Sequence, residues 1–168
     1  MNRIAFAIGA AACALLLGYG YYLQYVGGLE PCPLCLVQRA FYYLVGATLL
    51  LAAIHGPGRV GTWIYCSFAA LFAVGGIVTA GRQVWLQHLP ADQVPACGPD
   101  LAFMLDNYPL TRTIAKLFAG SGECAKVDWS FLGLSIAEWS LAWFIALLAG
   151  ALWLASRGKR RVDVAQQH

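Results

Sequence analysis

Long apolar runs separated by short polar stretches dominate the pattern of the chain. Four runs are almost free of charged residues, and each is close to the length of about 20 residues that crosses a bilayer as a helix. The pattern predicts an all-α membrane protein built as a four-transmembrane-helix bundle. The predicted spans cover about residues 4–26, 37–54, 60–81 and 136–156.

The polar stretches between the runs differ in length, which sets the predicted topology. Residues 55–59 read His-Gly-Pro-Gly-Arg, a helix-breaking cluster that predicts a tight turn between two antiparallel helices. The other two segments, a short one at about 27–36 and a long one at about 82–135, lie together on the opposite side. We therefore expect residues 1–168 to form a single domain with both termini on one side.

Composition excludes a soluble globular protein. Of the 168 residues, 60% are hydrophobic and only 11% are charged, against about 25% charged in an ordinary soluble domain. The net charge of +3 gives no sign of a nucleic-acid partner. The apolar excess must therefore face lipid.

The distribution of charge predicts the orientation. The side with the termini carries six basic residues against one acidic residue, Asp163, whereas the opposite side carries five basic and seven acidic residues. Basic residues accumulate on the cytoplasmic side of membrane proteins, and the bias acts weakly on long loops. Both termini are therefore predicted to be cytoplasmic. The six basic residues are Arg3, Arg59, Arg157, Lys159, Arg160 and Arg161.

The six cysteines separate by location. Cys13 and Cys66 fall within apolar spans, where cysteine usually acts as a small hydrophobic residue. The other four fall in the two outer segments, on the side predicted to be oxidising, where disulfides form. These four cysteines, Cys32, Cys35, Cys97 and Cys124, are the candidate reactive residues.

Cys32 and Cys35 form a C-x-x-C motif, Cys-Pro-Leu-Cys, at the start of the second span. The ring that their disulfide would close is too small to stabilise a fold much, but it suits repeated opening and closing. A helix is predicted directly after the motif, with Cys32 as its N-cap and Pro33 at the first helical position. Both sulfurs would then lie near the positive end of the helix dipole, which favours thiolate.

Arg39 follows Cys35 by one helical turn, on the same face of the predicted helix. A guanidinium group entering a membrane helix is costly, so we expect a functional role. It could stabilise the Cys35 thiolate, hold an electron-rich oxygen of a bound acceptor, or do both. The alternative is an interfacial arginine that extends to lipid headgroups.

Cys97 and Cys124 are 27 residues apart (124 − 97). A disulfide across such a loop would stabilise a fold by about 3 to 4 kcal/mol, which suits a structural bridge. The turn-rich flanks of both cysteines predict exposure, however, as an exchanging disulfide requires. Both possibilities stay open from the residues alone. A zinc site fits less well, because zinc sites usually combine two close cysteine pairs, and we predict no metal.

Two motifs carry a resemblance to a known family. Pro31–Cys35 is followed by Gln38-Arg39, and Ser121–Ala125 runs into Trp-Ser-Phe-Leu-Gly-Leu at 129–134. With four spans and two outer cysteine pairs, the chain resembles the DsbB family over nearly its whole length. The resemblance implies an inner-membrane enzyme that reoxidises a periplasmic DsbA-type thiol oxidase and passes electrons to membrane quinone, either ubiquinone or menaquinone. That relay is an established scheme of periplasmic thiol chemistry and comes here from the resemblance.

The resemblance also implies roles for the four outer cysteines. Cys97 matches the cysteine that forms a mixed disulfide with the partner, and Cys124 matches its disulfide mate. Cys32 and Cys35 match the pair nearest the membrane, with Cys35 the sulfur that faces quinone.

Arg39 and His88 match the family residues that bind quinone. Taken without the resemblance, His88 beside Trp85 is equally consistent with an interfacial anchor. Gln38 stands where other members carry an acidic residue, and we expect no catalytic loss from that difference.

Two other functions compete with the thiol oxidase. A four-span structural or adaptor protein would use both disulfides only to clamp its loops. A quinone or vitamin-K-type reductase would run the electrons in the opposite direction, but the C-x-x-C motif precedes the second span rather than lying near the last one, which disfavours that function.

Overall fold

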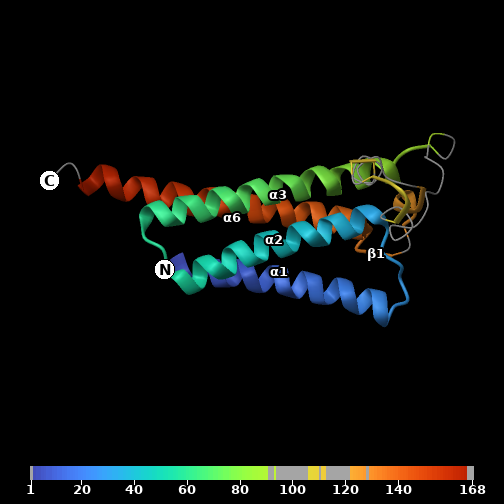
Figure 1. Cartoon of the computed structure of the whole chain (residues 1–168), viewed down its shortest axis with the longest axis horizontal. Helices are drawn as coiled ribbons and strands as arrows, with labels where there is room; N and C mark the ends of the chain where they lie inside the picture. The colour runs from blue at the N-terminus through green and yellow to red at the C-terminus, as the bar shows by residue number, and fades with distance from the viewer. Residues whose placement is uncertain are drawn as a thin grey trace.

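The structure, a computed structural model, describes residues 2–90, 93, 106–109, 111–112, 122–127 and 129–165. Within these residues four long helices dominate the architecture (Figure 1), and each is long and apolar enough to cross a membrane. The predicted all-α four-span fold is therefore confirmed. The helices are α1 (Asn2–Tyr25), α2 (Pro33–His55), α3 (Arg59–Gln87) and α6 (Ile136–Ala165).

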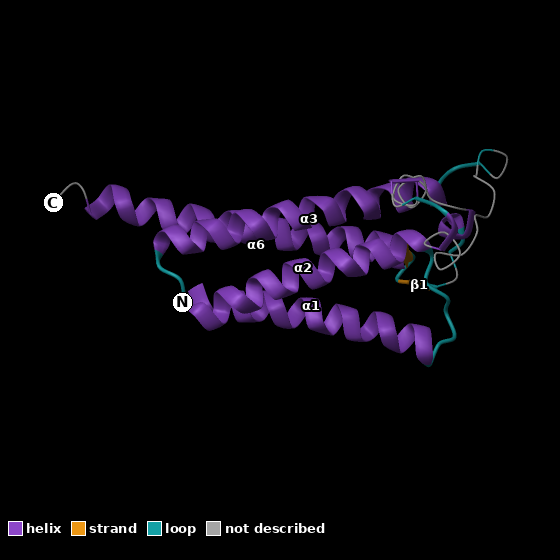
Figure 2. Ribbon diagram, viewed as in Figure 1, coloured by secondary structure: helices purple, strands orange, loops and turns teal. Residues whose placement is uncertain are grey.

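The helices run alongside one another, with both termini at one end of the bundle (Figures 1 and 2). We call the opposite end, where α1 and α3 finish and α2 and α6 begin, the cysteine end. Helix α1 packs on α2, α2 on α3 and α3 on α6, whereas α1 and α6 share few contacts. The backbones of α1 and α6 therefore lie farther apart than those of the three packed pairs.

Apolar side chains lie on both the inner and outer faces of the helices. The core contains Phe6, Val45 and Phe144, together with Cys13 and Cys66, which confirms that these two cysteines are buried. Large apolar side chains are also exposed along every helix, as expected of a surface that faces lipid.

A pair of glycines lets the helices approach closely. Gly75 and Gly76 lie in α3, and a methyl group added at either position would clash with a phenyl ring. The ring beside Gly75 is that of Phe41 on α2, and the ring beside Gly76 is that of Phe144 on α6. Small residues commonly allow such packing in membranes, where association depends on close van der Waals contact.

The ends of the helices agree with their sequence signals. Cys32 is the N-cap of α2 and Pro33 is its first residue, as predicted. Gly56 ends the helix in the left-handed conformation at φ 59°, where glycine carries no steric penalty. The guanidinium group of Arg3 donates to the carbonyl oxygens of Ala53 and Ile54, so it caps the last turn of α2.

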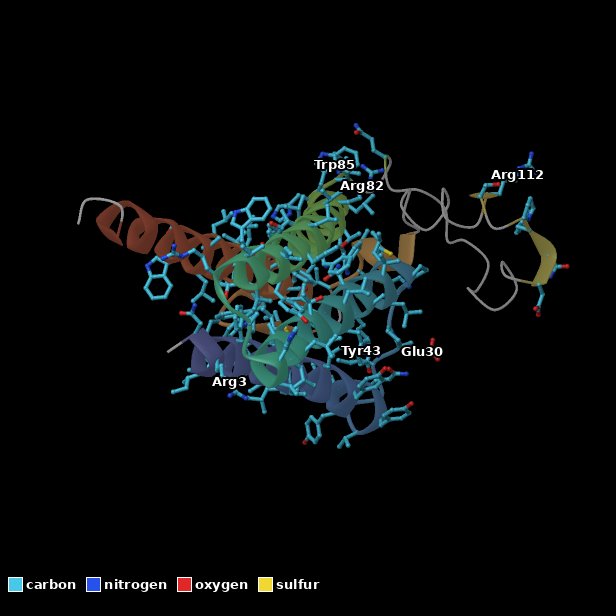
Figure 3. The ribbon with its side chains drawn as sticks, turned by 60° about the vertical axis from the view of Figure 1, so that its left-hand side comes forward. Arg3, Glu30, Tyr43, Arg82, Trp85 and Arg112 are labelled. Atoms are coloured by element: carbon cyan, nitrogen blue, oxygen red, sulfur yellow. The ribbon has the colours of Figure 1, made fainter. Side chains whose placement is uncertain are left out.

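Helix α3 continues past the predicted end of its span at residue 81 to Gln87. No glycine or proline interrupts residues 82–87, and α-helical geometry continues without a break. Figure 3 shows Arg82 beside Trp85, with the guanidinium carbon 4.3 Å from the centre of the indole ring. Such an arginine–tryptophan pair is typical of a helix that emerges at the membrane surface.

A hairpin of two short strands, β1 (Ser130–Phe131) and β2 (Leu134–Ser135), leads into α6. Ser135 caps this helix reciprocally with Glu138: the Ser135 N–H donates to Oε2 of Glu138 at 2.7 Å, and the Glu138 N–H donates to Oγ of Ser135. The same Ser135 hydroxyl donates to the Gln87 side chain at 2.8 Å. The start of α6 is thereby fixed to the end of α3.

We expect Gly76→Ala to destabilise the bundle by about 1 to 3 kcal/mol, because the added methyl group overlaps the Phe144 ring. Gly81→Ala is the matched control, since nothing lies within 4 Å of its added methyl group. Thermal unfolding in detergent measures both variants. Equal melting temperatures for the two would contradict the close α3–α6 packing.

Candidate functional site

Three of the four predicted reactive cysteines meet at the cysteine end. The sulfur atoms of Cys32 and Cys35 are 3.0 Å apart, and the Cys32 thiol also hydrogen-bonds with the Cys124 side chain. Cys124 lies on a short 3₁₀ helix, η1 (Gly122–Ala125), which packs against α2 and α3. The sulfurs therefore follow one another in the order 124, 32, 35.

Cys124 is fully buried, so the exposure expected from its turn-rich flanks is wrong. It forms a small apolar cluster with Cys32, Leu34 and Leu86. Tertiary packing buries this residue, because η1 lies against α3 and α2 and places Cys124 next to the C-x-x-C motif. Cys97 lies outside the described residues, and its pairing with Cys124 stays a prediction.

The sequence predicted that both sulfurs of the motif favour the thiolate form, and for Cys32 this prediction is wrong. Its hydrogen bonds with Cys124 and with Cys35, together with burial, raise the pKa of the Cys32 thiol above the usual range. The hydrogen bonds favour the protonated form first, and burial disfavours the charged form further. In the reduced pair, Cys32 therefore keeps its proton.

Two buried glutamines that the sequence analysis did not select as site residues lie beside the sulfurs. The side-chain nitrogen Nε2 of Gln83 lies 3.3 Å from Sγ of Cys35 and 3.4 Å from Sγ of Cys32. Gln38 in turn donates to Oε1 of Gln83 at 2.6 Å. The sequence contains one signal that could have identified these glutamines, namely their polarity. A glutamine near the end of an apolar span needs a hydrogen-bond partner within the protein.

Arg39 points toward α1 and not only toward the surface. Nη1 donates to Oε1 of Gln24 at 2.5 Å and Nη2 donates to the carbonyl oxygen of Gly20 at 3.0 Å. The guanidinium carbon also lies 4.7 Å from the centre of the Tyr21 ring. These contacts hold the charge inside the protein, which favours the functional role over an arginine that only reaches lipid headgroups.

A cavity of about 390 Å³ lies at the cysteine end between α1, α2 and α6. Cys35 and Arg39 both line it, as expected for residues one turn apart on one face of α2, and the N-cap Cys32 lines it too. Its walls are mainly apolar and include the aromatic rings of Trp139 and Trp143 from α6. Its size and its few polar groups are typical of a site for a small, largely apolar molecule.

An aromatic cluster borders this cavity. The Trp129 ring stacks near Phe131 and meets Tyr19 of α1 edge to face, with ring centres 6.1 Å and 6.0 Å apart. Trp139 donates its indole N–H to the carbonyl oxygen of Phe131 at 3.1 Å, which fixes the hairpin over the start of α6. Residues of α1 and of the hairpin thus both line the cavity.

His88 is not brought together with the other predicted site residues. It is exposed at the end of α3, where Nδ1 lies 2.8 Å from the carbonyl oxygen of Val84, and it is not among the residues that line the cavity. Its contact with quinone stays a prediction that the geometry does not support.

Comparisons with known proteins identify a family for the chain. The family model described as disulfide bond formation protein DsbB matches residues 2–154. A protein from Nitrosococcus oceani named disulfide bond formation protein B is 50% identical over 92% of both chains. Proteins of the same name from Hahella chejuensis and Chromobacterium violaceum are 48% and 44% identical, over 88% and 95% of this chain and 90% and 96% of their own lengths.

These matches cover the four membrane-length helices and both outer segments. They support a multi-pass membrane thiol oxidase, that is, an oxidoreductase that forms disulfides, over a purely structural protein. The chain belongs to the DsbB family of disulfide bond formation proteins.

Proposed function

We propose that this protein reoxidises a periplasmic DsbA-type dithiol oxidase and passes the electrons to a membrane quinone, ubiquinone or menaquinone. The observation that carries the proposal is the order of contacts at the cysteine end. Cys124 touches Cys32, Cys32 touches Cys35, and Cys35 lines a cavity that Arg39 also lines. A chain of adjacent sulfurs that ends at a cavity suits transfer of electron pairs between a protein and a small acceptor.

The first step is thiol–disulfide exchange with the partner. A partner thiolate attacks Cys97 of a Cys97–Cys124 disulfide, forming a mixed disulfide and leaving the electron pair on Cys124 as thiolate. The second partner thiol then attacks the mixed disulfide, which releases the oxidised partner and leaves Cys97 reduced. Burial of Cys124 supports this division of roles, because an external protein does not reach that sulfur directly.

The second step moves the electron pair inward. The Cys124 thiolate attacks Cys32, so a Cys124–Cys32 bond forms, the Cys32–Cys35 bond breaks, and the electron pair goes to Cys35. The contact between Cys124 and Cys32 supports this step directly. The Cys97 thiolate can then attack Cys124, which restores the outer disulfide and returns Cys32 to its reduced form.

The residues of the cavity fit a quinone. The volume of about 390 Å³ and the mainly apolar walls suit a ring with an apolar tail. Arg39 lines the cavity and has five N–H groups, of which Gln24 and Gly20 engage two, so others could donate to a carbonyl oxygen. When bound, a quinone supplies a sink for two electrons and two protons. The cavity is lined by residues of membrane-length helices α1, α2 and α6, and we propose that quinone, which dissolves in the membrane, enters it between α1 and α6.

Energetics require a strong acceptor. A DsbA-type oxidase has a reduction potential of about −120 mV, and each 30 mV corresponds to about 1.4 kcal/mol for a two-electron couple. A disulfide able to oxidise such a partner needs a stabilised reduced form, a favourable acceptor, or both.

The charge pattern supports an inner-membrane location with both termini in the cytoplasm and the cysteine end in the periplasm. Six basic residues lie on the side of the termini, and the reactive cysteines lie on the other side, where disulfides persist.

We expect Cys32 and Cys124 to form a disulfide in the variant Cys35→Ser/Cys97→Ser under mild oxidation, since the two side chains are in contact. Peptide mass spectrometry without reduction identifies the bond. The matched control is Cys32→Ser/Cys97→Ser, in which Cys35 is the one cysteine of the motif left to pair with Cys124. The Cys32–Cys124 bond should form faster in the first variant than the Cys35–Cys124 bond forms in the control. Equal rates, or a faster Cys35–Cys124 bond, would contradict the order of the relay.

Wild-type protein in detergent should reduce quinone when it is mixed with a reduced DsbA-type protein. Cys97→Ala and Cys35→Ala should each abolish turnover, because one removes the entrance and the other the exit of the relay. Loss of quinone ultraviolet absorbance measures the rate. No turnover by the wild type with ubiquinone or menaquinone, together with disulfides that resist mild reductant, would support the structural function instead.

Arg39→Met should weaken use of quinone by about 10- to 100-fold in kcat/KM, because the cavity loses a charged hydrogen-bond donor beside Cys35. The rate of mixed-disulfide formation with the partner should stay within about twofold of wild type, since Arg39 serves the last step of the proposed relay and Cys97 the first. An unchanged KM and kcat for quinone would remove Arg39 from the site.

A further inference from the structure

The side chain of Gln83 occupies a position that the proposed relay leaves without a role. It extends from α3 toward the start of α2, and 4% of its surface is exposed. Its amide nitrogen lies within hydrogen-bond distance of both sulfurs of the C-x-x-C motif. A primary amide has two N–H groups, so one can be directed at each sulfur.

Gln38 determines which end of the Gln83 amide faces the sulfurs. Its own nitrogen Nε2 donates to Oε1 of Gln83 at 2.6 Å, and Gln38 is also 4% exposed. Because the oxygen of Gln83 is engaged on that side, the nitrogen is directed at the sulfurs. The two glutamines come from different helices, so the arrangement exists only when α2 and α3 are packed together.

The same amide can serve the Cys35 sulfur in both of its protonation states. As a thiol, Cys35 donates to Oε1 of Gln83 at 3.5 Å. As a thiolate it has no proton to donate, and it accepts from Nε2 at 3.3 Å instead. Hydrogen bonds to an ionised group are stronger than those between neutral groups.

We propose that Gln83 is a catalytic residue that stabilises the negative charge on Cys35 when the Cys32–Cys35 bond breaks, and that Gln38 is a positioning residue that orients the Gln83 amide. The inference rests on the proposed relay. In that step the Cys124 thiolate forms a bond to Cys32, and the electron pair of the broken bond goes to Cys35. A donor aimed at the leaving sulfur speeds this exchange and favours the reduced form of the pair.

An interhelical hydrogen bond that only holds α2 and α3 together is the competing explanation. It predicts that loss of Gln83 lowers stability without a specific change at the sulfurs. The two explanations differ in the redox equilibrium of the Cys32–Cys35 pair, because only a donor to the thiolate favours one redox state over the other.

The test uses the full chain in detergent, without quinone or partner, in a Cys97→Ser/Cys124→Ser background. The protein is equilibrated with glutathione buffers, and alkylation followed by mass spectrometry gives the reduced fraction of the pair. Gln83→Met, which keeps the length and loses the donor, should shift the equilibrium about 10- to 100-fold toward the disulfide. Reduction of the pair by dithiothreitol should slow in the same variant, because the leaving thiolate loses its donor.

Thr79→Val is the matched control. Thr79 is buried in α3 one turn before Gln83, and its hydroxyl group bonds only to carbonyl oxygens of its own helix in the contacts described. This variant should stay within about twofold of the background. Equal shifts for Gln83→Met and Thr79→Val, or no shift for Gln83→Met, would overturn the proposal.

Gln38→Met tests the positioning role and provides a second variant if Gln83→Met does not fold. It should shift the equilibrium in the same direction by a smaller factor. The double variant Gln38→Met/Gln83→Met should match Gln83→Met alone, because Gln38 acts through Gln83. Additive shifts, or no shift in Gln38→Met, would overturn that role. Since no quinone is present, absent quinone turnover in the full enzyme would count against the proposed function and not against this inference.

Discussion

The site depends on one constraint: within the apolar layer of a bilayer, a polar or charged group must find its partners within the protein. Water is scarce there, and an unpaired group costs several kcal/mol by order of magnitude. Arg39 meets the requirement through Gln24 and the backbone of Gly20 on α1, and Gln38 meets it through Gln83 on α3. Each polar group near the sulfurs therefore binds α2 to a neighbouring helix.

The same constraint connects the packing of the bundle with its chemistry. Helices α1 and α3 lie on different sides of α2, and each supplies a polar partner to a residue that follows the C-x-x-C motif. The glycines of α3 let α2 and α6 approach closely enough for these contacts to be fixed. Between α1 and α6 the packing is sparse, and the cavity lies on that side. Hydrogen bonds between helices hold the residues beside the sulfurs, and the cavity provides room for a small molecule.

The position of Cys124 illustrates how a short segment can complete such a site. The four residues of η1 cross no membrane and form little regular structure. Their packing against α3 nevertheless buries Cys124 against Cys32. Contact between sulfurs matters because thiol–disulfide exchange requires one sulfur to attack another directly. Each sulfur of the relay must therefore be able to touch the next one.

The sequence by itself determined the helices, the turn at residues 55–59, the N-cap at Cys32 and the shared face of Cys35 and Arg39. These are local properties, fixed by hydrophobic length, by proline and glycine, and by the helical repeat of α2. Only the tertiary structure decided that Cys124 is buried, that Gln83 reaches the sulfurs, and that His88 stays outside the cavity. Those three outcomes depend on how α3, η1 and α2 pack against one another, and contacts between residues about 50 or more positions apart leave no periodic signal in the chain.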